Sequence, residues 1–335
     1  MDLSDSSVAQ ALVDATDKGA MAINMSFGTD GSQPASQAVV DAIDYAYGHN
    51  VVLAAAAADQ AVTEQGDPAN VLQPAGTGGD ITQGKGLDVT SADFAGQRSS
   101  FAGLGSEVSI AAFGSFADSG GPAGILGAFP ANLTTIETGS LGVPPQPPCT
   151  DCRTTFQGDN RYAYLQGTSM ATPMVTAVGA LMRHLNPYLR ASEAIRILKA
   201  TAQRPAGSGW TQDLGWGILD GGAAMDAARR VDHNQPVSRL SAPTRTRSTR
   251  IRLTWTASDP APAGLIASGL DHVEVWRSID GRSFAKIAVS RATALVVHAS
   301  SGHRYAFYTL AVDRAGNREA APTHTARTRV AGRRR

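Results

Sequence analysis

The chain has 335 residues, 42% of them hydrophobic and 17% charged, and its 29 basic and 29 acidic side chains leave no net charge. This length suffices for about two domains of ordinary globular composition. No run of about 18 apolar residues is present, which excludes a membrane-spanning helix. The first five residues, MDLSD, are acidic and polar where a signal peptide needs a basic region. The sequence is therefore either cytoplasmic or lacks its beginning.

Charge divides the chain near residue 235. Through Gln235 there are 12 basic and 23 acidic residues, and from Pro236 onward there are 17 basic and 6 acidic residues. This asymmetry predicts two domains of different character. The arginine excess in the second half could attract anionic surfaces, but without interleaved aromatic residues it is more typical of a solvated face. We expect no nucleic-acid partner.

The first 230 residues alternate short apolar runs with helical patterns. Helical spacing and end signals predict helices over residues 7–18, 37–47, 170–184, 192–202 and 223–230. Buried strands are expected over 20–28, 50–58 and 215–220, with further strands between 99 and 114. The alternation predicts an α/β fold with a parallel sheet covered on both faces. Residues 114–160, rich in Gly, Pro, Ser and Thr, are expected to form a long surface excursion.

The only two cysteines, Cys149 and Cys152, lie in a proline-rich stretch of this excursion. Two ligands cannot close a tetrahedral zinc site. A redox Cys-x-x-Cys motif should follow a strand and open a helix, which this one does not. A small loop disulfide is favoured, with free thiols as the alternative.

After Pro236 the pattern changes to a period of two. Alternating strands are expected over residues 250–256, 272–277 and 304–313, with a turn at Asp280 and Gly281. Several short strands in this space predict a small β-sandwich over residues 235–330. The last strand and its AVDRAGN ending resemble the fibronectin type III-like modules of bacterial exported proteins. Such a module would contact a surface or polymer.

Residues 167–173 read Gly-Thr-Ser-Met-Ala-Thr-Pro and lead into an Ala-rich apolar helix. Ser169 is thereby predicted at a helix N-terminus, where unpaired N–H groups and the helix dipole favour negative charge. An acyl-transfer enzyme places its nucleophile and an oxyanion-binding N–H at such a point. Gly167 permits close approach of another chain, and Pro173 is expected within the first helical turn. The alternative is an ordinary capped helix, because Thr and Ser are common N-caps.

This string resembles the nucleophile motif of the subtilisin-like serine proteases, or subtilases. Ala171 excludes the Gly-x-Ser-x-Gly elbow of α/β-hydrolases, and Thr172 excludes a Ser-x-x-Lys motif. The resemblance extends in order over about residues 7–230 and includes the segments 99–105, 110–114 and 209–224. It implies a subtilisin-like three-layer catalytic domain over residues 1–234, N-terminally incomplete. Such a domain hydrolyses peptide bonds through an acyl-enzyme on Ser169.

The resemblance also assigns a substrate groove, in which the end of the first strand pairs with an extended peptide. The residues expected to bind substrate are Ser26, Phe27, Gly28, Ala56, Ala57, Gly167 and Thr168.

The strand over residues 51–59 aligns with a family strand whose final Asn donates a hydrogen bond to the oxyanion. Asp59 occupies that position. An ionised carboxylate has no hydrogen to donate, so only a protonated Asp59 could serve there. We assign Asp59 as a catalytic residue by position, with a strand-end turn residue as the alternative.

The family order places the catalytic Asp and His before the segment that begins at Ile23. None of the seven histidines precedes Ile23 or has the family context, so no acid–base pair is assigned. We expect a truncated, weakly active or inactive endopeptidase, or alternatively a non-catalytic peptide- or surface-binding pseudo-protease. A fragment with uncovered sheet edges could also aggregate.

The resemblance further implies a polypeptide substrate and a secreted or cell-surface location. No cofactor is expected. Calcium often binds subtilases, so the resemblance allows a calcium ion here, but its usual ligands lie in segments that have no match and no metal ligand is assigned.

Overall fold

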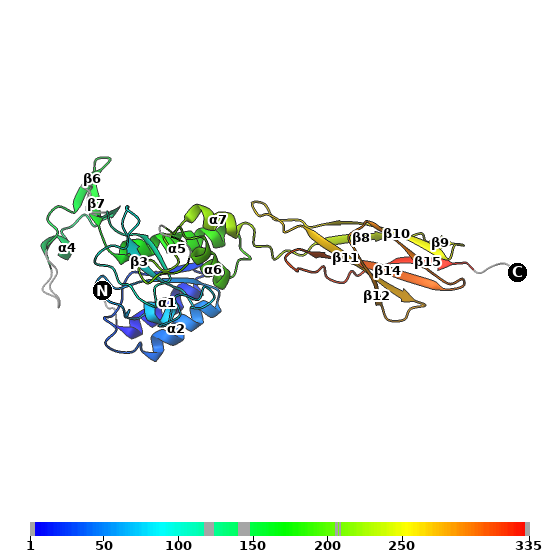
Figure 1. Ribbon diagram of the computed structural model, residues 1–335, viewed down its shortest axis with the longest axis horizontal. Helices are drawn as coiled ribbons and strands as arrows, with labels where there is room; N and C mark the ends of the chain where they lie inside the picture. The colour runs from blue at the N-terminus through cyan, green and yellow to red at the C-terminus, as the bar shows by residue number, and fades with distance from the viewer. Residues whose placement is uncertain (1–3, 117–123, 140–147, 205–206, 208, 332–335) are drawn as a thin grey trace. The chain divides into compact units, whose positions relative to one another are not determined.

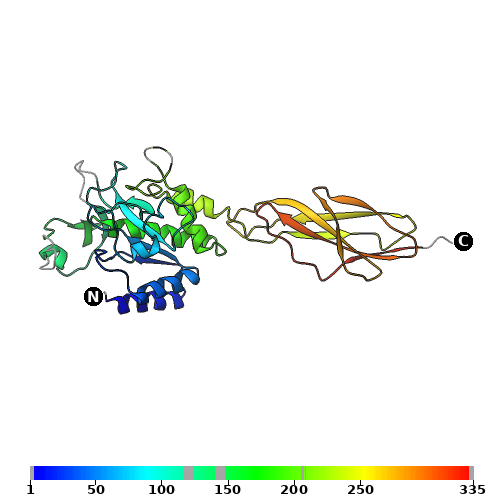
Figure 2. The same ribbon diagram turned by 60° about the horizontal axis from the view of Figure 1, so that its bottom comes forward.

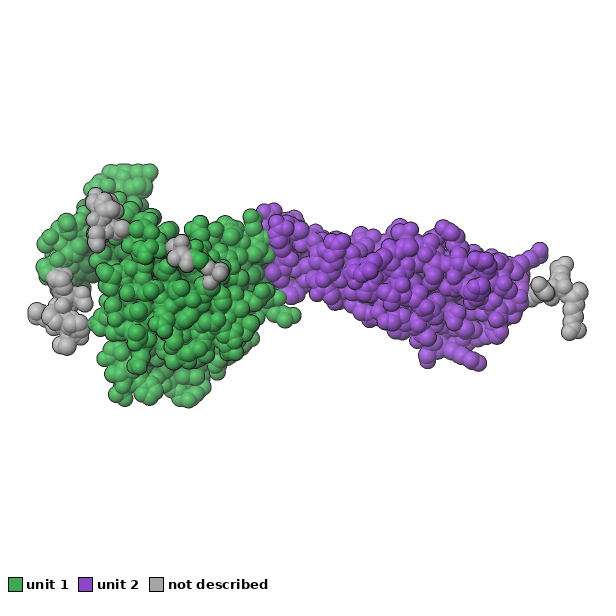
Figure 3. All heavy atoms as spheres, viewed as in Figure 1, with its two compact units in different colours: residues 1–228 green, residues 229–335 purple. Residues whose placement is uncertain are grey.

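The computed structural model describes residues 4–116, 124–139, 148–204, 207 and 209–331. The chain divides into two compact units, residues 1–228 and 229–335, which Figure 3 colours separately. Three residues of the acidic start, 1–3, lie outside the described residues. Parts of the expected excursion, 117–123 and 140–147, also lie outside them.

The first unit is built on a four-stranded parallel sheet with the strand order β1-β2-β3-β4. The strands are β1 (Ala22–Met25), β2 (Val52–Ala56), β3 (Leu87–Ala92) and β4 (Ile110–Phe113). Every residue of β2 and β3 is buried, as expected for the central strands of a covered parallel sheet. The predicted α/β fold with a parallel sheet is confirmed.

Strand β3 is not predicted by the sequence pattern, because polar residues interrupt its apolar run. The carboxyl group of one of them, Asp88, is fully buried, and neither of its oxygens has a hydrogen-bond partner among the described residues. Burial raises the pKa of Asp88 well above its usual range, and the nearby charge of Glu107 adds to this effect. The sheet thus carries an unsatisfied acid in its core.

Helices cover both faces of the sheet (Figure 1). One layer packs its apolar side chains with Leu53 and Ala55 of β2 and consists of α1 (Asp5–Asp17), α2 (Gln37–Gly48) and α3 (Ala69–Leu72). The opposite layer consists of α5 (Thr168–Leu185), α6 (Ala191–Thr201) and α7 (Gly221–Ala228). Alternate residues of a strand face opposite sides, so Val52 packs against Gly179 of α5. Figure 2 shows α1 and α2 together on one side of the unit.

All five helices predicted from the sequence are present, as α1, α2, α5, α6 and α7. Among the described residues, none of the helices combines the length and hydrophobicity needed to cross a bilayer. The strand predicted over residues 215–220 is instead a set of single bridges beside β4. The Trp216 N–H donates to the Ser109 carbonyl at 3.0 Å, and the Leu219 N–H donates to the Ala111 carbonyl at 2.8 Å.

Part of the expected surface excursion is folded. It forms an antiparallel sheet in the order β5-β7-β6 and a short helix, α4 (Thr135–Thr138). The strands are β5 (Ile125–Ala128), β6 (Arg153–Phe156) and β7 (Asp159–Leu165). Strand β7 leads directly to the Ser169 turn, so this sheet is attached at the start of α5.

The disulfide favoured from the sequence is not formed, and both cysteines are free thiols. The Cys152 thiol donates to the Cys149 carbonyl at 3.3 Å. Burial, together with the neighbouring Cys149, raises the pKa of Cys152 to about 11. The free-thiol alternative therefore describes this structure.

The second unit contains two sheets that share one hydrophobic core, with the strand orders β13-β10-β8 and β12-β11-β14-β15-β9. The strands are β8 (Val237–Ser241), β9 (Arg245–Thr246), β10 (Arg250–Ser258), β11 (Leu270–Ile279), β12 (Ala285–Ser290), β13 (Ala294–His298), β14 (Arg304–Asp313) and β15 (Ala326–Val330). Trp255 of one sheet and Val275 and Phe307 of the other lie in that core. The three strands predicted here fall within β10, β11 and β14. The predicted turn joins β11 to β12, with positive φ angles of 51° at Asp280 and 80° at Gly281.

A buried acid also stands in the second unit, but this one is paired. Glu274 is 7% exposed and accepts hydrogen bonds from Lys286 at 2.9 Å, Arg318 at 2.6 Å and the Trp276 ring at 3.1 Å. Burial alone would raise the pKa of Glu274, but these three donors outweigh burial and lower it to about 2.

Candidate active site

Ser169 is the second residue of α5, which begins at Thr168 with Gly167 as its N-cap. Gly167 has φ 150° and ψ 161°, a backbone conformation that residues with a Cβ rarely adopt. A Cβ atom added at Gly167 would lie 3.1 Å from a carboxylate oxygen of Asp59. The Ser169 N–H has no acceptor among the described residues, as expected in the first turn of a helix. The position expected for a nucleophile at a helix N-terminus is therefore observed.

Pro173 does not lie in the first turn of α5, as the sequence analysis expects, but is the sixth residue of the helix. The helix starts at Thr168, two residues before the expected start at residue 170. A proline has no N–H, and Pro173 therefore cannot bond to the carbonyl four residues earlier, that of Ser169. This carbonyl instead accepts a hydrogen bond from the Ser26 hydroxyl at 2.9 Å.

A second hydrogen bond links the same two serines in the opposite direction. The Ser169 hydroxyl donates to the Ser26 carbonyl at 3.2 Å. The Asn24 side chain of β1 donates to the Ser26 hydroxyl at 3.0 Å. The end of β1 and the start of α5, 143 residues apart in the chain, are thus held together at the candidate nucleophile.

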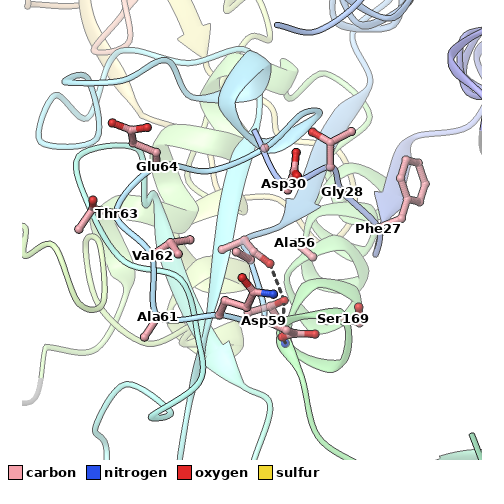
Figure 4. Close-up of a pocket in the computed structure, with 16 residues that line it drawn as sticks. Phe27, Gly28, Asp30, Ala56, Asp59, Ala61, Val62, Thr63, Glu64 and Ser169 are labelled. Atoms are coloured by element: carbon pink, nitrogen blue, oxygen red, sulfur yellow. Dashed lines mark hydrogen bonds between the residues drawn. The ribbon is translucent and has the colours of Figure 1, made fainter. Parts of the chain in front are cut away.

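A groove of about 760 Å³ opens beside Ser169 (Figure 4). Its described lining comes from the residues after β1, from the end of β2 and its following loop, and from the start of α5: Phe27, Gly28, Thr29, Asp30, Ala56, Ala57, Ala58, Asp59, Gln60, Ala61, Val62, Thr63, Glu64, Gly66, Thr168 and Ser169. The structure thus brings together both candidate catalytic residues and five of the seven residues expected to bind substrate. Ser26 and Gly167 do not line the groove but hold its walls through the contacts above.

Asp59 is a hydrogen-bond acceptor in this site. One of its carboxylate oxygens, Oδ1, accepts from the Thr168 N–H at 2.7 Å and lies 2.9 Å from the Thr168 hydroxyl, which also lies 2.7 Å from the Ala57 carbonyl. A carboxylate from the end of β2 therefore caps α5, because Gly167 has no side chain to do so. Contact between Asp59 and an oxyanion stays a prediction.

The loop after β2 contributes groove residues that the sequence analysis does not identify. Residues 60–64 follow Asp59 directly, and five of the lining positions lie there. Their position in the chain could have identified them, because the loop after the carboxyl end of a parallel strand lies at the edge of the sheet where ligands bind.

The charged residues of the lining are Asp30, Asp59 and Glu64, and no Lys, Arg or His is present in the described lining. Hydrogen bonds from Ser32 lower the pKa of Asp30. The groove is therefore acidic, and no general base for Ser169 is assigned within it.

One cluster in the second unit has the composition of a cation site. Carboxylate oxygens of Asp232, Asp259 and Asp313 all lie within 4.8 Å of one another. Burial and the charges of the other two acids raise the pKa of Asp259. All three already accept hydrogen bonds from backbone N–H groups, namely those of Ser268, Gly269 and Asn317. No ligand role is assigned to them.

The subtilase family model matches residues 1–217 of this chain. Fervidolysin of Fervidobacterium pennivorans is 31% identical over 224 residues, which cover 66% of this chain and 28% of that protein. An extracellular protease of Xanthomonas campestris pv. campestris is 25% identical over 257 residues, or 73% of this chain and 36% of that protein. This chain therefore spans about a third of the length of these relatives.

Solved structures show the same fold. A protease from Pseudoalteromonas arctica PAMC 21717 is 26% identical, with a TM-score of 0.50 and coverage of 67% of this chain and 58% of that one. A lanthipeptide protease at 19% identity, with a TM-score of 0.51 and coverage of 67% and 66%, supports the fold alone. Because the family model covers more than half of the chain, from the first helix through the serine turn and beyond α6, the chain belongs to the subtilase family.

Proposed function

We propose that the first unit is the C-terminal part of a subtilisin-like serine endopeptidase domain, in which Ser169 attacks the carbonyl carbon of a peptide bond. One observation carries this proposal. The Ser169 hydroxyl stands at the N-terminus of α5, on the border of a groove that the ends of β1 and β2 also line.

The segment at residues 26–28, which lines the groove through Phe27 and Gly28, suits an extended polypeptide. It follows β1, the last strand on its side of the described sheet, and extended chains bind such edges by backbone pairing. A substrate N–H that bonded to the Ser26 carbonyl would compete with the Ser169 hydroxyl for that acceptor. Substrate binding would then release the hydroxyl for attack.

In the acylation step, Ser169 Oγ bonds to the substrate carbonyl carbon, the C–N bond breaks, and the proton that the hydroxyl loses passes through water to the leaving amine. Water later hydrolyses the ester, which releases the acid and restores the hydroxyl. The Ser169 N–H would donate to the oxyanion, and Asp59 stands where a second donor is needed. The Ser26 carbonyl cannot act as the base, because an amide oxygen is too weakly basic to take up the Ser169 proton at neutral pH. A subtilisin-type site without its base retains about 10³–10⁴-fold acceleration over water, so we expect slow reaction of the 335-residue chain.

A binding module is the second candidate function. The acceptor role of Asp59 and the absence of His from the described lining both favour it. In that case the groove would hold a peptide without cleaving it. We further propose that residues 235–330 form a fibronectin type III-like module that contacts a surface or polymer. We also propose that the protein acts outside the cell, as the extracellular protease of Xanthomonas does by its name.

Fluorophosphonate labelling tests the nucleophile. We expect slow, stoichiometric modification that mass spectrometry places on Ser169, lost in Ser169→Ala and kept in Ser100→Ala, an exposed serine outside the groove. Labelling at other serines, or none at all together with retained peptide binding, would favour the binding module. Rapid labelling would contradict the expected weak activity.

A further inference from the structure

Two of the three acidic side chains that line the groove have no positively charged partner in the described part of the chain. Asp59 is engaged with Thr168, but Asp30 and Glu64 are exposed and form no ion pair with any described residue. The Asp30 carboxylate accepts a backbone hydrogen bond from Ser32 at 2.9 Å, which fixes its loop without neutralising its charge. Two uncompensated negative charges therefore face the groove.

These two charges come from different segments of the chain. Asp30 belongs to the segment that follows β1, and Glu64 belongs to the loop that follows β2. In the view of Figure 4 both lie on the upper side of the lining, whereas Asp59 and Ser169 lie on the lower side. In the same view Ala56 and Val62 lie between these two levels, so a substrate side chain that extended from Ser169 toward Asp30 and Glu64 would pass them.

The small groups are apolar. Ala56, Ala57, Ala61 and Val62 supply methyl groups to the lining. Long basic side chains match this order, because their methylene stems pack on apolar surface while their charged heads reach polar groups. An acidic side chain would be repelled, and a purely apolar one would leave both carboxylates without a partner.

We propose that this groove selects a cationic side chain, Arg or Lys, in the substrate residue whose carbonyl Ser169 attacks. This specificity rests on the proposed function of the groove as a substrate site. Arg is the sharper probe, because its guanidinium stays charged at every working pH.

Equilibrium binding of non-reacting peptides tests this specificity without using the Ser169 chemistry. The probes are two fluorescent acetyl-tripeptide amides that end in arginine or in citrulline, which has nearly the same shape but no charge. Fluorescence anisotropy with the full chain should give about 10-fold tighter binding of the arginine peptide at low salt. The difference should shrink at high salt.

Variants that replace the carboxylates with amides test whether Asp30 and Glu64 cause the preference for the arginine peptide. The Asp30→Asn/Glu64→Gln double variant should bind both peptides equally. The Asp14→Asn/Asp41→Asn double variant, an equal charge change on the exposed sides of α1 and α2, should keep the preference. Circular dichroism of each variant verifies the fold.

Equal affinities for the two peptides in the parent chain, no saturable binding of either, or a preference that survives in the double variant would overturn the proposal. Failure of fluorophosphonate labelling alongside arginine-selective binding would instead count against Ser169 as the nucleophile and leave the specificity standing.

Discussion

Replacing Asp59 with Asn should accelerate the reaction of Ser169 with a fluorophosphonate. The carboxylate accepts the Thr168 N–H at 2.7 Å, one residue from the N–H expected to receive the oxyanion. The amide oxygen of an Asn can keep this bond. Its Nδ2 then replaces the second carboxylate oxygen with a hydrogen-bond donor.

Two effects add in the same direction. A single well-placed oxyanion donor contributes about 3 kcal/mol to transition-state stabilisation. Two negative charges about 4 Å apart repel by about 1 kcal/mol in water and about 4 kcal/mol at an effective dielectric constant of 20. Because Asp59 is exposed, the lower repulsion applies. Together these effects predict a rate increase of about 100- to 1000-fold.

The assay is the second-order rate constant of phosphonylation, followed by intact-protein mass spectrometry with and without Ser169→Ala. Asp30→Asn is the matched control, because it removes a charge from the same groove without touching α5. We expect that control to change the rate by less than about 5-fold. An unchanged or slower rate in Asp59→Asn would refute the proposal that the side chain at position 59 contacts the oxyanion. An equal rate increase in Asp30→Asn would show that the lost negative charge alone causes the increase.

Three further predictions concern stability. Gly167→Ala should lower the free energy of unfolding by about 1–3 kcal/mol, because its backbone conformation disfavours a Cβ; an unchanged urea midpoint would contradict the strained turn. Glu274, with its pKa lowered to about 2, should stabilise the second unit by up to about 3 kcal/mol above pH 5, and this contribution should disappear as the pH falls toward 2. Urea titrations at pH 7 and pH 3 should therefore differ less in Glu274→Gln than in the parent chain, and an identical difference would count against the assignment. Asp88→Val should raise the free energy of unfolding by about 1–3 kcal/mol, because it removes a buried acid without partners; a loss of stability would mean that the acid has a partner.

Periodicity predicted the helices well, because each has a clear apolar face and end signals. It failed at β3, where Asp88, Thr90 and Ser91 are buried at positions that the pattern reads as polar loop. It also failed in the segment leading to β7, whose antiparallel strands are only partly buried. Local pattern cannot report burial that neighbouring segments impose.

The position of Ser169 at a helix N-terminus was predictable from its motif, since the turn before α5 needs a glycine. Its role as a nucleophile stays a prediction. The bonding role of Asp59 was not predictable. Its partner Thr168 lies 109 residues away in the chain, and only the folded sheet brings the two together. The acids of the groove were missed because Asp30 and Glu64 belong to loops without a recognisable pattern.

The proline in α5 has a consequence for how the site tolerates movement. Because Pro173 leaves the Ser169 carbonyl to Ser26, the start of α5 and the segment that follows β1 are joined by direct hydrogen bonds as well as through the sheet. Thermal motion of the outer strand would carry both partners together. The distance between Ser169 and this segment would then fluctuate less than the scaffold around it.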